Sequence, residues 1–596
     1  MAADGDDRPD RSAASAPQDD DSEPSDDAIV AGLDRLTLAV VGVVAAALAA
    51  RLIFLGARVA HWDEGRVAYW VLDYLRYGDL IYRPIIHGPL YHHVNRPVFA
   101  VLGANDFTMR LFPAIVGGLL PGAALLFREH LDDIETALLA VFLAFNPVLL
   151  YYSRFMRGDI LVAAFMFTAF GCLVRTIDTG RNRYLVAAGA LVALGFSAKE
   201  NALIYLLTWV GATALLLDIR LLTARFREEK PLAVLKRYLG WGYRGLRIRL
   251  AALGATVATF LVVLVYMYAP RGTTDNLPIN TTERYNGTGF NEALTDPSAL
   301  PDVVWAALYD SGQAMFGQWI GGGSADHPYL PYLGDHVQTL VEGALVVCLF
   351  AVFGFLVNRY RGVDRTDLVS FAFYCGFVSV LGYPIITDIK APWATVHPVI
   401  MLTIPAAVGV ALVIRWGRDA FASEDAVGMA LSAVVVFLAV GIVASSALSG
   451  VYLQPQAEDN KLVQYAQPAD DIHPEMAVLD TIAEDNEGGP DLLLYGEYFV
   501  DGASESSFEP ACARWFNALP LPWYISASEA NVTCAQDDRA LDALGDDKPP
   551  MVIVRSDARA AVERNFPEYV RTEKRLRVYG TETSFYVAPE YADQLE

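Results

Sequence analysis

Long apolar stretches recur along this chain of 596 residues and alternate with short polar segments. Many approach the length of about 20 residues that an α-helix needs to cross a hydrocarbon core of about 30 Å. We predict about eleven membrane-spanning helices, at residues 36–56, 107–127, 136–152, 160–176, 184–198, 202–218, 250–268, 337–357, 367–386, 397–414 and 427–449. The pattern therefore predicts an α-helical polytopic membrane protein.

The segments before and between these stretches divide the chain further. Residues 1–33 consist mostly of Asp, Ser, Pro and Ala, a composition that is typical of a disordered tail. Residues 34–449 hold the predicted spans, and two long polar segments at 57–106 and 269–336 interrupt them. We expect these two segments to be large external loops of the membrane domain.

The last part of the chain, residues 450–596, follows a different pattern. Short apolar runs predict strands at residues 491–495, 551–555 and 584–587. A helical stretch near residues 557–565 separates two of these runs. We therefore predict a small soluble α/β domain. Cys512 and Cys534 both fall in it, and a disulfide between them is permissible if the domain lies outside the cell.

Lys and Arg are unevenly distributed between the loops. With the N-terminus inside the cell, the basic segments 175–183, 220–249, 358–365 and 415–418 all fall on the cytoplasmic side, as the positive-inside rule requires. The same count places the C-terminal domain outside. We thus expect a multi-pass protein of the cell membrane with a cytoplasmic N-terminus.

The negative charge belongs to the two ends of the chain. Of the net charge of −24, residues 1–35 contribute −8 and residues 451–596 contribute −17. Acidic soluble surfaces are typical of proteins that work in high salt, which favours a salt-loving archaeon, although an ordinary acidic ectodomain is the alternative. Nucleic acid is not an expected partner, because the chain shows no basic face large enough to compete with this acidity.

Ionisable residues gather in the segments that are predicted to face outside. Asp63, Glu64 and Arg66 come directly after the first span. The others are His87, Arg157, Asp159, Lys199, Glu200, Lys390 and His397. Ionisable groups at membrane depth are costly and mark a lined cavity or a pathway. Snorkelling is the alternative for a single Arg or Lys at a span end.

The order of these residues resembles that of a known group of proteins. Asp63-Glu64-x-Arg66 is similar to the first-loop motif of lipid A aminoarabinose transferases and of protein O-mannosyltransferase-like proteins. Further similar motifs are His87-Gly88-Pro89-Leu90, Arg110-Leu111-Phe112-Pro113, Asn146-Pro147, Ser153-Arg154-x-x-Arg157-x-Asp159, Lys199-Glu200 and Lys390-x-Pro392-Trp393 with His397-Pro398. The chain resembles most an archaeal subgroup, the flippase-activity-associated proteins of N-glycosylation.

This resemblance implies a fold and a reaction. The group consists of multi-span GT-C type glycosyltransferases that use polyprenyl-phosphate sugars, so a GT-C-like core is expected over about residues 36–400. The expected partners are a polyprenyl-phosphate sugar lipid, a glycan or protein acceptor, and the membrane lipids. His87-Gly88 departs from the Lys-Pro that many relatives carry there, which puts the phosphate contact at this position in question.

The chemistry of such a transfer assigns roles to the residues. A carboxylate accepts the proton of the acceptor hydroxyl, and cations stabilise the departing phosphate. We assign Asp63 as the base. Glu64 and Asp159 are expected to orient the acceptor or to hold a divalent cation, Mg²⁺ or Mn²⁺. The candidate substrate- and phosphate-binding residues are Arg66, His87, Arg157, Lys199, Glu200, Lys390, Trp393 and His397.

Other functions compete with the transferase. A non-enzymatic factor that helps to move or present a dolichyl-phosphate-linked sugar would use the same cavity, and would depend more on Lys199 and Lys390 than on Asp63. An ion-coupled transporter is disfavoured, because acidic residues deep in the spans are sparse and the chain shows no paired halves with matching broken helices. Histidines 87, 92 and 93 are an alternative metal-binding group, although isolated surface histidines are more common.

Overall fold

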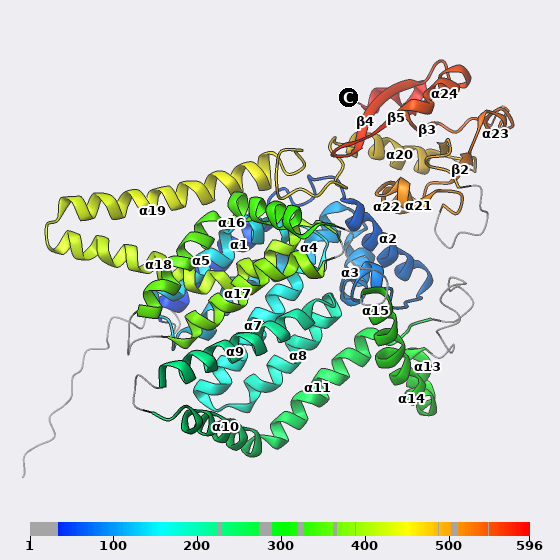
Figure 1. Cartoon of the computed structure of the whole chain (residues 1–596). Helices are drawn as coiled ribbons and strands as arrows, with labels where there is room; N and C mark the ends of the chain where they lie inside the picture. The colour runs from blue at the N-terminus through cyan, green and yellow to red at the C-terminus, as the bar shows by residue number, and fades with distance from the viewer. Residues whose placement is uncertain are drawn as a thin grey trace, which may run out of the picture.

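The computed structural model describes residues 34–224, 229–272, 289–319, 327–360, 366–387, 389–486, 488–501, 510–545 and 547–595. The predicted tail at 1–33 lies outside the described residues. Figure 1 shows a bundle of long helices with a small domain of strands and short helices at its upper right.

Nine helices of the described residues are long and apolar enough to cross a membrane. They are α1 (Arg35–Leu52), α4 with η3 (Asp106–Phe127), α7 (Gly158–Thr179), α9 (Ala202–Ala224), α11 (Leu250–Tyr268), α16 (Tyr329–Tyr360), α17 (Asp367–Ile386), η9 with α18 (Pro392–Ala422), and α19 with η10 (Ala426–Leu453). The predicted spans 136–152 and 184–198 coincide with shorter helices, α5 (Asp133–Phe145) with α6 (Pro147–Tyr152), and α8 (Asn182–Ala198). The predicted fold class is confirmed, whereas the count of about eleven spans stays a prediction.

Helix α18 forms the centre of the bundle, where 94% of its most apolar stretch is buried. It packs against α5, α16, α17 and α19. Gly354 of α16 and Gly409 of α18 let two backbones touch, because a Cβ on either would collide with the main chain of the other helix. Small residues permit such close approach between helices in a membrane. The central helix thereby gives the spans around it a fixed position.

The segments that we predicted as external loops are largely helical. The first holds α2 (Trp62–Tyr77), η2 (Pro84–Ile86) and α3 (Leu90–Leu102). The second holds α13 (Phe290–Thr295), η6 (Pro297–Ala299), α14 (Leu300–Trp305), η7 (Ala306–Asp310) and α15 (Ser311–Trp319), and the basic segment 220–249 holds α10 (Pro231–Ile248). A search for long apolar runs misses such helices, because their apolar residues lie on one face only.

Helix α2 carries the first acidic pair and is fixed at both ends. His61 caps its start, since the ring accepts a hydrogen bond from Asp63 N at 2.9 Å and Glu64 accepts one from His61 N at 3.0 Å. Gly78 ends the helix with φ of 77°, a conformation that costs little without a Cβ. A helix cap is worth about 1 kcal/mol. The cap also fixes the direction of the first turn.

The chain after α19 forms the predicted α/β domain. Its strands are β1 (Leu492–Tyr495), β2 (Val532–Ala535), β3 (Met551–Arg555), β4 (Val570–Arg577) and β5 (Gly580–Val587), in the order β2-β1-β3-β5-β4. Strand β1 pairs in parallel with β2 and β3, whereas β5 runs antiparallel to β3 and β4. The helices are α20 (His473–Asp485), α21 (Trp515–Ala518), α22 (Leu521–Ala527), α23 (Asp538–Asp542), η11 (Ser556–Ala558), α24 (Arg559–Asn565) and η12 (Pro589–Leu595). We did not predict β2 and β4. Most residues of β4 are charged, so it lacks the apolar run that marks the strands we predicted.

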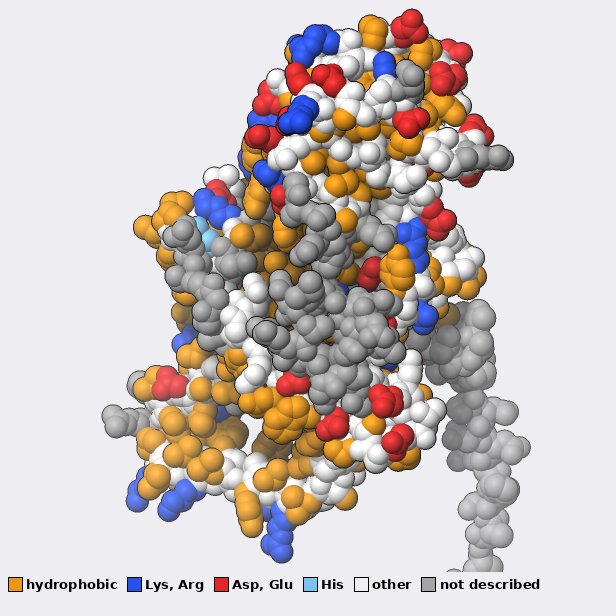
Figure 2. Space-filling model, turned by 90° about the vertical axis from the view of Figure 1, so that its right-hand side faces the viewer, with side chains coloured by type: hydrophobic (Ala, Val, Ile, Leu, Met, Phe, Trp, Pro, Cys, Tyr) orange, Lys and Arg blue, Asp and Glu red, His pale blue; other side chains and the backbone are white. Residues whose placement is uncertain are grey.

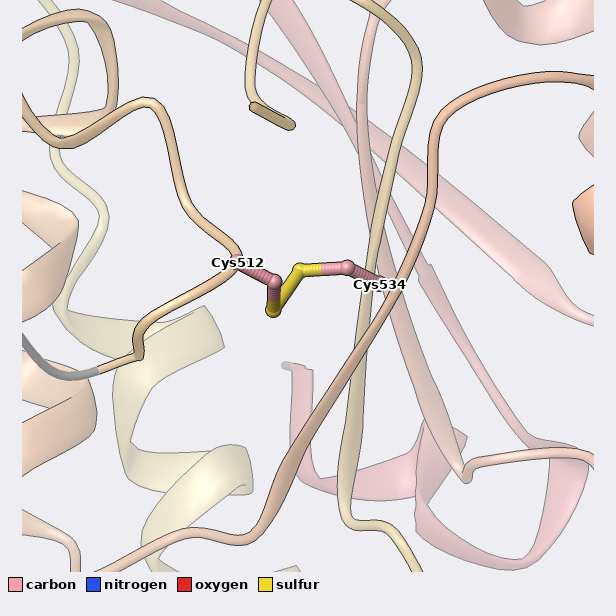
Figure 3. Close-up of a disulfide and its surroundings, with 2 residues drawn as sticks. All are labelled: Cys512 and Cys534. Atoms are coloured by element: carbon pink, nitrogen blue, oxygen red, sulfur yellow. A yellow bond between two sulfur atoms is a disulfide. The ribbon is translucent and has the colours of Figure 1, made fainter. Parts of the chain in front are cut away.

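A disulfide joins two segments of this domain. Cys512 and Cys534 are bonded, with their Cα atoms 6.1 Å apart (Figure 3). The bond links the segment before α21 to the edge strand β2. The three other cysteines are free, and Cys172 and Cys375 are buried in the bundle as their apolar surroundings predicted.

Asp106, at the start of α4, anchors the C-terminal domain on the bundle. Its carboxylate accepts hydrogen bonds from Trp523 Nε1 at 2.9 Å and from Tyr524 Oη at 2.7 Å. His473 Nε2 lies 2.9 Å from the same carboxylate. The domain also packs closely on α2, because a Cβ on Gly65 would lie 2.9 Å from the Pro520 side chain. The C-terminal domain therefore covers the helix that bears the acidic pair.

We predict that this anchoring depends on pH. Burial acts to lower the pKa of His473, but the hydrogen bonds to Asp106 and Asp471 outweigh it and raise the pKa to about 9. The pKa is higher in the folded state, so its stabilising effect is complete below the ordinary value of about 6.5 and is lost as pH rises through about 9. We expect about 1–2 kcal/mol, less than the pKa difference alone gives, because the side chain is a third exposed.

The measurement is the midpoint of thermal unfolding of the full chain in detergent between pH 6 and pH 10. The His473→Gln variant should lose most of the decrease that the wild type shows near pH 9. An equal decrease in both proteins would contradict the assignment.

Candidate active site

Four parts of the chain that are far apart in sequence come together at the candidate site. The first turn of α2 contributes Asp63, and the start of α7 contributes its N-cap residue Arg157 and Asp159. The turn between α8 and α9 contributes Lys199 and Glu200, and the start of α18 contributes His397. Gly88 and Gly158 allow these parts to approach, because a Cβ on either would collide with the main chain at residues 197–198. The turn that carries Lys199 is therefore held against the start of α7, which carries Asp159.

Arg157 links two carboxylates at the centre of the site. It donates hydrogen bonds to Asp63 through Nη1 and to Asp159 through Nε, the second over 3.3 Å. Asp63 also accepts a hydrogen bond from Arg66 Nη2 at 2.9 Å. Each of these four side chains is at most 8% exposed. Their charges therefore interact more strongly than they would in water.

Asp159 has further partners from the interior of the bundle. Lys199 Nζ donates to its Oδ1 at 2.8 Å, and His397 Nε2 lies 3.2 Å from the same oxygen. The His397 ring is fixed in turn by Tyr205 Oη at 2.9 Å from Nδ1 and by Asn201 Nδ2 at 2.8 Å from Nε2. The structure thus places His397 against a carboxylate, where it orients Asp159.

His87 and Glu200 extend the site toward α15. Glu200 lies 3.1 Å from His87 Nδ1 and accepts a hydrogen bond from Tyr82. The His87 ring stacks on Trp319, with the ring centroids 5.4 Å apart, and its Nε2 lies 3.4 Å from Arg157 Nη2. His87 has φ of 68°, a costly conformation for a residue with a side chain that persists only where its surroundings enforce it.

Aromatic rings line the cationic side of the site. Trp393 lies under the Arg157 guanidinium, 3.8 Å from ring centroid to Cζ, and Trp62 lies 4.7 Å from Arg66 in the same way. Phe155 packs against Trp393 with the centroids 6.3 Å apart. Cation–π contacts of this kind hold a guanidinium in place without neutralising its charge. Arg157 and Arg66 thus keep their positions and their charge while they pair with Asp63.

Glu64 lies beside this site in a cluster of its own. Arg110 donates to both of its oxygens at 2.8 Å, and Arg58 Nη2 lies 2.9 Å from Oε2. The main-chain N–H groups of Met156 and His61 donate at 2.7 and 3.0 Å. The Glu64 and Arg110 side chains are both fully buried. Glu64 therefore ties α2 to α4 and to the turn before α7.

Ion pairing decides the pKa values of the acidic pair. Burial acts to raise the pKa of Asp63, but Arg157 and Arg66 outweigh it and hold the pKa well below its usual range. Burial also acts to raise the pKa of Glu64, and Arg110 and Arg58 lower it to about 2. Both carboxylates are therefore ionised at neutral pH. Burial lowers the pKa of Lys199, although Asp159 acts in the opposite direction.

The structure brings most of the predicted site residues together. One connected network holds Asp63, Arg66, His87, Arg157, Asp159, Lys199, Glu200, Trp393 and His397. Lys390 lies apart, since its Nζ pairs with Asp335 at 2.8 Å and the two side chains are 41% and 53% exposed.

Sequence reasoning gave no role to Arg58, His61 and Arg110, the partners of Glu64. Arg110 belongs to the Arg110-Leu111-Phe112-Pro113 motif, which resembles a motif of the GT-C type glycosyltransferases. That resemblance could have indicated a role for Arg110. Arg58 follows the first span directly, where snorkelling explains a basic residue equally well.

The predicted cation site at Glu64 and Asp159 does not match the observed contacts. The oxygens of both carboxylates accept hydrogen bonds from N–H donors, most of them cationic. Mg²⁺ instead takes oxygen ligands in octahedral geometry. No group of three or more His, Cys, Asp or Glu side chains that could hold a metal occurs among the described residues. A divalent cation thus stays a prediction, and no step below uses one.

Comparison with known families identifies two parts of the chain. Residues 86–236 match the family model described as dolichyl-phosphate-mannose-protein mannosyltransferase. Residues 472–588 match the Agl23 flippase-associated protein C-terminal domain. The chain matches no curated protein.

Solved structures show the same fold. The apo crystal structure of ArnT from Cupriavidus metallidurans matches with a TM-score of 0.52 and 14% identity, over 92% of this chain and 97% of that chain. The ArnT structure bound to undecaprenyl phosphate gives 0.51 and 16%, over 93% and 99%. The oligosaccharyltransferase AglB from Archaeoglobus fulgidus reaches only 0.44 and 12%, over 87% and 69%.

These matches confirm the resemblance that the motifs indicated. The chain has the fold of ArnT, a helical membrane domain with a small C-terminal domain. The family match and the fold together support a glycosyltransferase activity.

We predict that the Glu64 cluster is essential to stability. Arg110→Met leaves a buried carboxylate without its main partner, which costs about 3–5 kcal/mol. The double variant Glu64→Met, Arg110→Met removes both charges and should recover a large part of that loss. The measurement is the thermal midpoint of each variant in the same detergent. A single variant as stable as the wild type would contradict the assigned role of the pair.

Proposed function

We propose that this protein is a membrane glycosyltransferase of archaeal surface-glycan or N-glycoprotein assembly. It moves a sugar from a polyprenyl (dolichyl) phosphate donor to an acceptor on the outer face of the membrane. The observation that carries the proposal is the Arg157 guanidinium shared between Asp63 and Asp159. In that arrangement the proposed base, Asp63, is in direct contact with the proposed phosphate-binding cation, Arg157.

The proposed reaction exchanges one bond at the anomeric carbon of the sugar. The acceptor hydroxyl oxygen forms a bond to this carbon, while the bond from the carbon to the phosphate oxygen breaks. The proton of the hydroxyl passes to the Asp63 carboxylate, and the electron pair of the broken bond stays on the lipid phosphate. Arg157, Arg66 and Lys199 stabilise that charge, which is the largest electrostatic contribution that such a site can make.

Donor binding also prepares the base. In the structure, Arg157 and Arg66 hold the pKa of Asp63 well below its usual range, which makes Asp63 a weak proton acceptor. A donor phosphate that takes over Arg157 removes the main cation from Asp63. The pKa of the buried carboxylate then rises, because burial disfavours its charged form. The proposed site therefore gains basicity when the donor has bound.

We predict that Asp63→Asn abolishes transfer. Loss of a general base costs about 10²–10⁴-fold in rate, while the amide keeps the shape of the side chain. The measurement is transfer by the full-length protein from a synthetic polyprenyl-phosphate sugar, alongside glycan analysis of a gene-deletion strain complemented with each variant. Lys390→Gln is the matched control and should stay near the wild-type rate, because Lys390 lies outside the network.

An Asp63→Asn protein that transfers at nearly the wild-type rate would overturn the assignment of the base. Accumulation of charged donor, together with one sugar missing from the glycan, is the expected result in the deletion strain.

We predict a second effect on the pH dependence. Arg157→Gln removes the cation that lowers the pKa of Asp63 most, so this pKa rises. A base acts only above its pKa, so the acidic limb of the kcat/KM profile should move to higher pH. The profile is measured between pH 4 and pH 8. An unchanged limb with a raised KM alone would assign Arg157 to donor binding and remove it from the control of Asp63.

A second candidate function rests on the C-terminal domain. Residues 472–588 match a flippase-associated protein, which favours a factor that handles dolichyl-phosphate-linked sugars without reacting. Such a factor needs the cations of the site but no base. Full rescue of the deletion strain by Asp63→Asn, with donor trapped on the cytoplasmic leaflet when the protein is absent, would favour it over the transferase.

A further inference from the structure

Helix α10 is an isolated amphipathic helix at the end of the bundle away from the C-terminal domain (Figure 1). It connects the spans α9 and α11 and contacts little else in the described chain. Val234 is its one buried residue. Beside it, Tyr238 faces Arg220 of α9 at 5.8 Å from ring centroid to Cζ. Within the described part of the chain, most other side chains of α10 are exposed.

The basic residues of α10 share one side. At 100° per residue, the side chains of Lys236, Arg237, Arg244 and Arg247 fall within an arc of about 100°. All four are exposed. The surface ion pair that involves them joins Arg237 to Glu229 at 3.3 Å. Figure 2 shows Lys and Arg side chains along the lowest edge of the molecule, at the height of α10, with hydrophobic side chains beside them.

Much of the remaining circumference is apolar, and several of its side chains are strongly exposed. Leu232, Leu239, Trp241 and Ile248 are 61%, 63%, 60% and 82% exposed. Leu232 and Leu239 lie beside one edge of the basic arc (the leucine side), and Trp241 and Ile248 lie beside the other edge (the tryptophan side). A short helix with a cationic arc and a large apolar arc lies in the plane of a membrane surface, with its apolar side among the acyl chains. Exposure of these apolar side chains to water would be unfavourable.

We propose that α10 is a binding site for anionic lipid headgroups at the membrane surface. The apolar arc inserts at the boundary of the acyl chains, and the four cations meet the phosphates. The position of α10 in the chain supports a lipid as the binding partner. The helix is joined at both ends to membrane spans, α9 and α11, which place it at the level of the headgroups. Charge complementarity supports it too, since each Lys or Arg near an anionic leaflet adds to the attraction.

The acidic N-terminal tail of the same chain is the main competitor for this face. Its negative charge matches the basic arc, but residues 1–33 hold few large apolar side chains, namely Met1, Ile29, Val30 and Leu33. Such a segment can neutralise the cations, yet it cannot cover the leucine and tryptophan sides. A leaflet covers both parts of the helix at once. A lipid surface therefore fits α10 better than the tail does.

The test uses the full-length protein in nanodiscs of phosphatidylcholine that contain brominated phosphatidylglycerol or brominated phosphatidylcholine. Bromine quenches nearby tryptophan, and the difference between wild type and Trp241→Phe isolates the signal of α10. We expect quenching by the anionic lipid to exceed that by the neutral lipid severalfold, and the excess to fall with salt. The variant Lys236→Gln, Arg237→Gln, Arg244→Gln, Arg247→Gln should lose the excess.

The matched control removes four cations from the C-terminal domain, as Arg539→Gln, Arg559→Gln, Arg564→Gln and Arg571→Gln, and should keep it. Equal quenching by both lipids in the wild type would overturn the proposal. An excess that arises only after deletion of residues 1–33 would assign the face to the tail. Protection of Trp241 from both lipids, with a dimer mass that the α10 variant loses, would assign it to a second copy.

Discussion

The buried ion pair between Glu64 and Arg110 is the contact on which the site depends. It joins the first turn of α2 to α4, and the same carboxylate binds the main chain at Met156, one residue before Arg157. Asp63, next to Glu64, is thereby set opposite Arg157. Burying an ion pair costs free energy of desolvation. Removing only one of its partners costs more stability, because the other charge then stays buried without a partner. The pair therefore gives the site one geometry at the expense of tolerance to single substitutions.

Much of the fold follows from apolar periodicity alone. The apolar runs at 250–268 and 367–386 are continuous and long, so they indicate membrane-spanning helices whatever residues surround them. The strands at residues 551–555 and 584–587 likewise stand out, because both are buried and apolar. Helices α2, α3 and α10 could not be found in this way. Each has polar and apolar residues interleaved at helical spacing, and only contacts with the bundle or the membrane decide its course.

The candidate site, like the fold, could be predicted only in part from the sequence. Residue type and order along the chain indicated Asp63, Arg157, Asp159 and Lys199, because charged groups near spans need a reason to be there. Distance in space could not be predicted. Lys390 carries the same kind of motif as Lys199, yet it pairs with Asp335 at the surface. Its charge is satisfied by a neighbour that lies 55 residues away, and no local pattern records such a pairing.

The charge balance of the site limits how a substrate can enter. Within this network, Asp63, Asp159 and Glu200 face Arg66, Arg157 and Lys199, and each of these cations already pairs with a carboxylate. An added phosphate would leave an excess negative charge in a medium of low dielectric, which is unfavourable. Donor binding must therefore exchange partners, with the phosphate taking a cation from a carboxylate. Arg157 is the cation best placed for that exchange, because it contacts both Asp63 and Asp159. It also rests on an aromatic ring that holds it when one of them is released. The ion pairs of Arg157 that hold the site together are thus the same interactions that donor binding replaces.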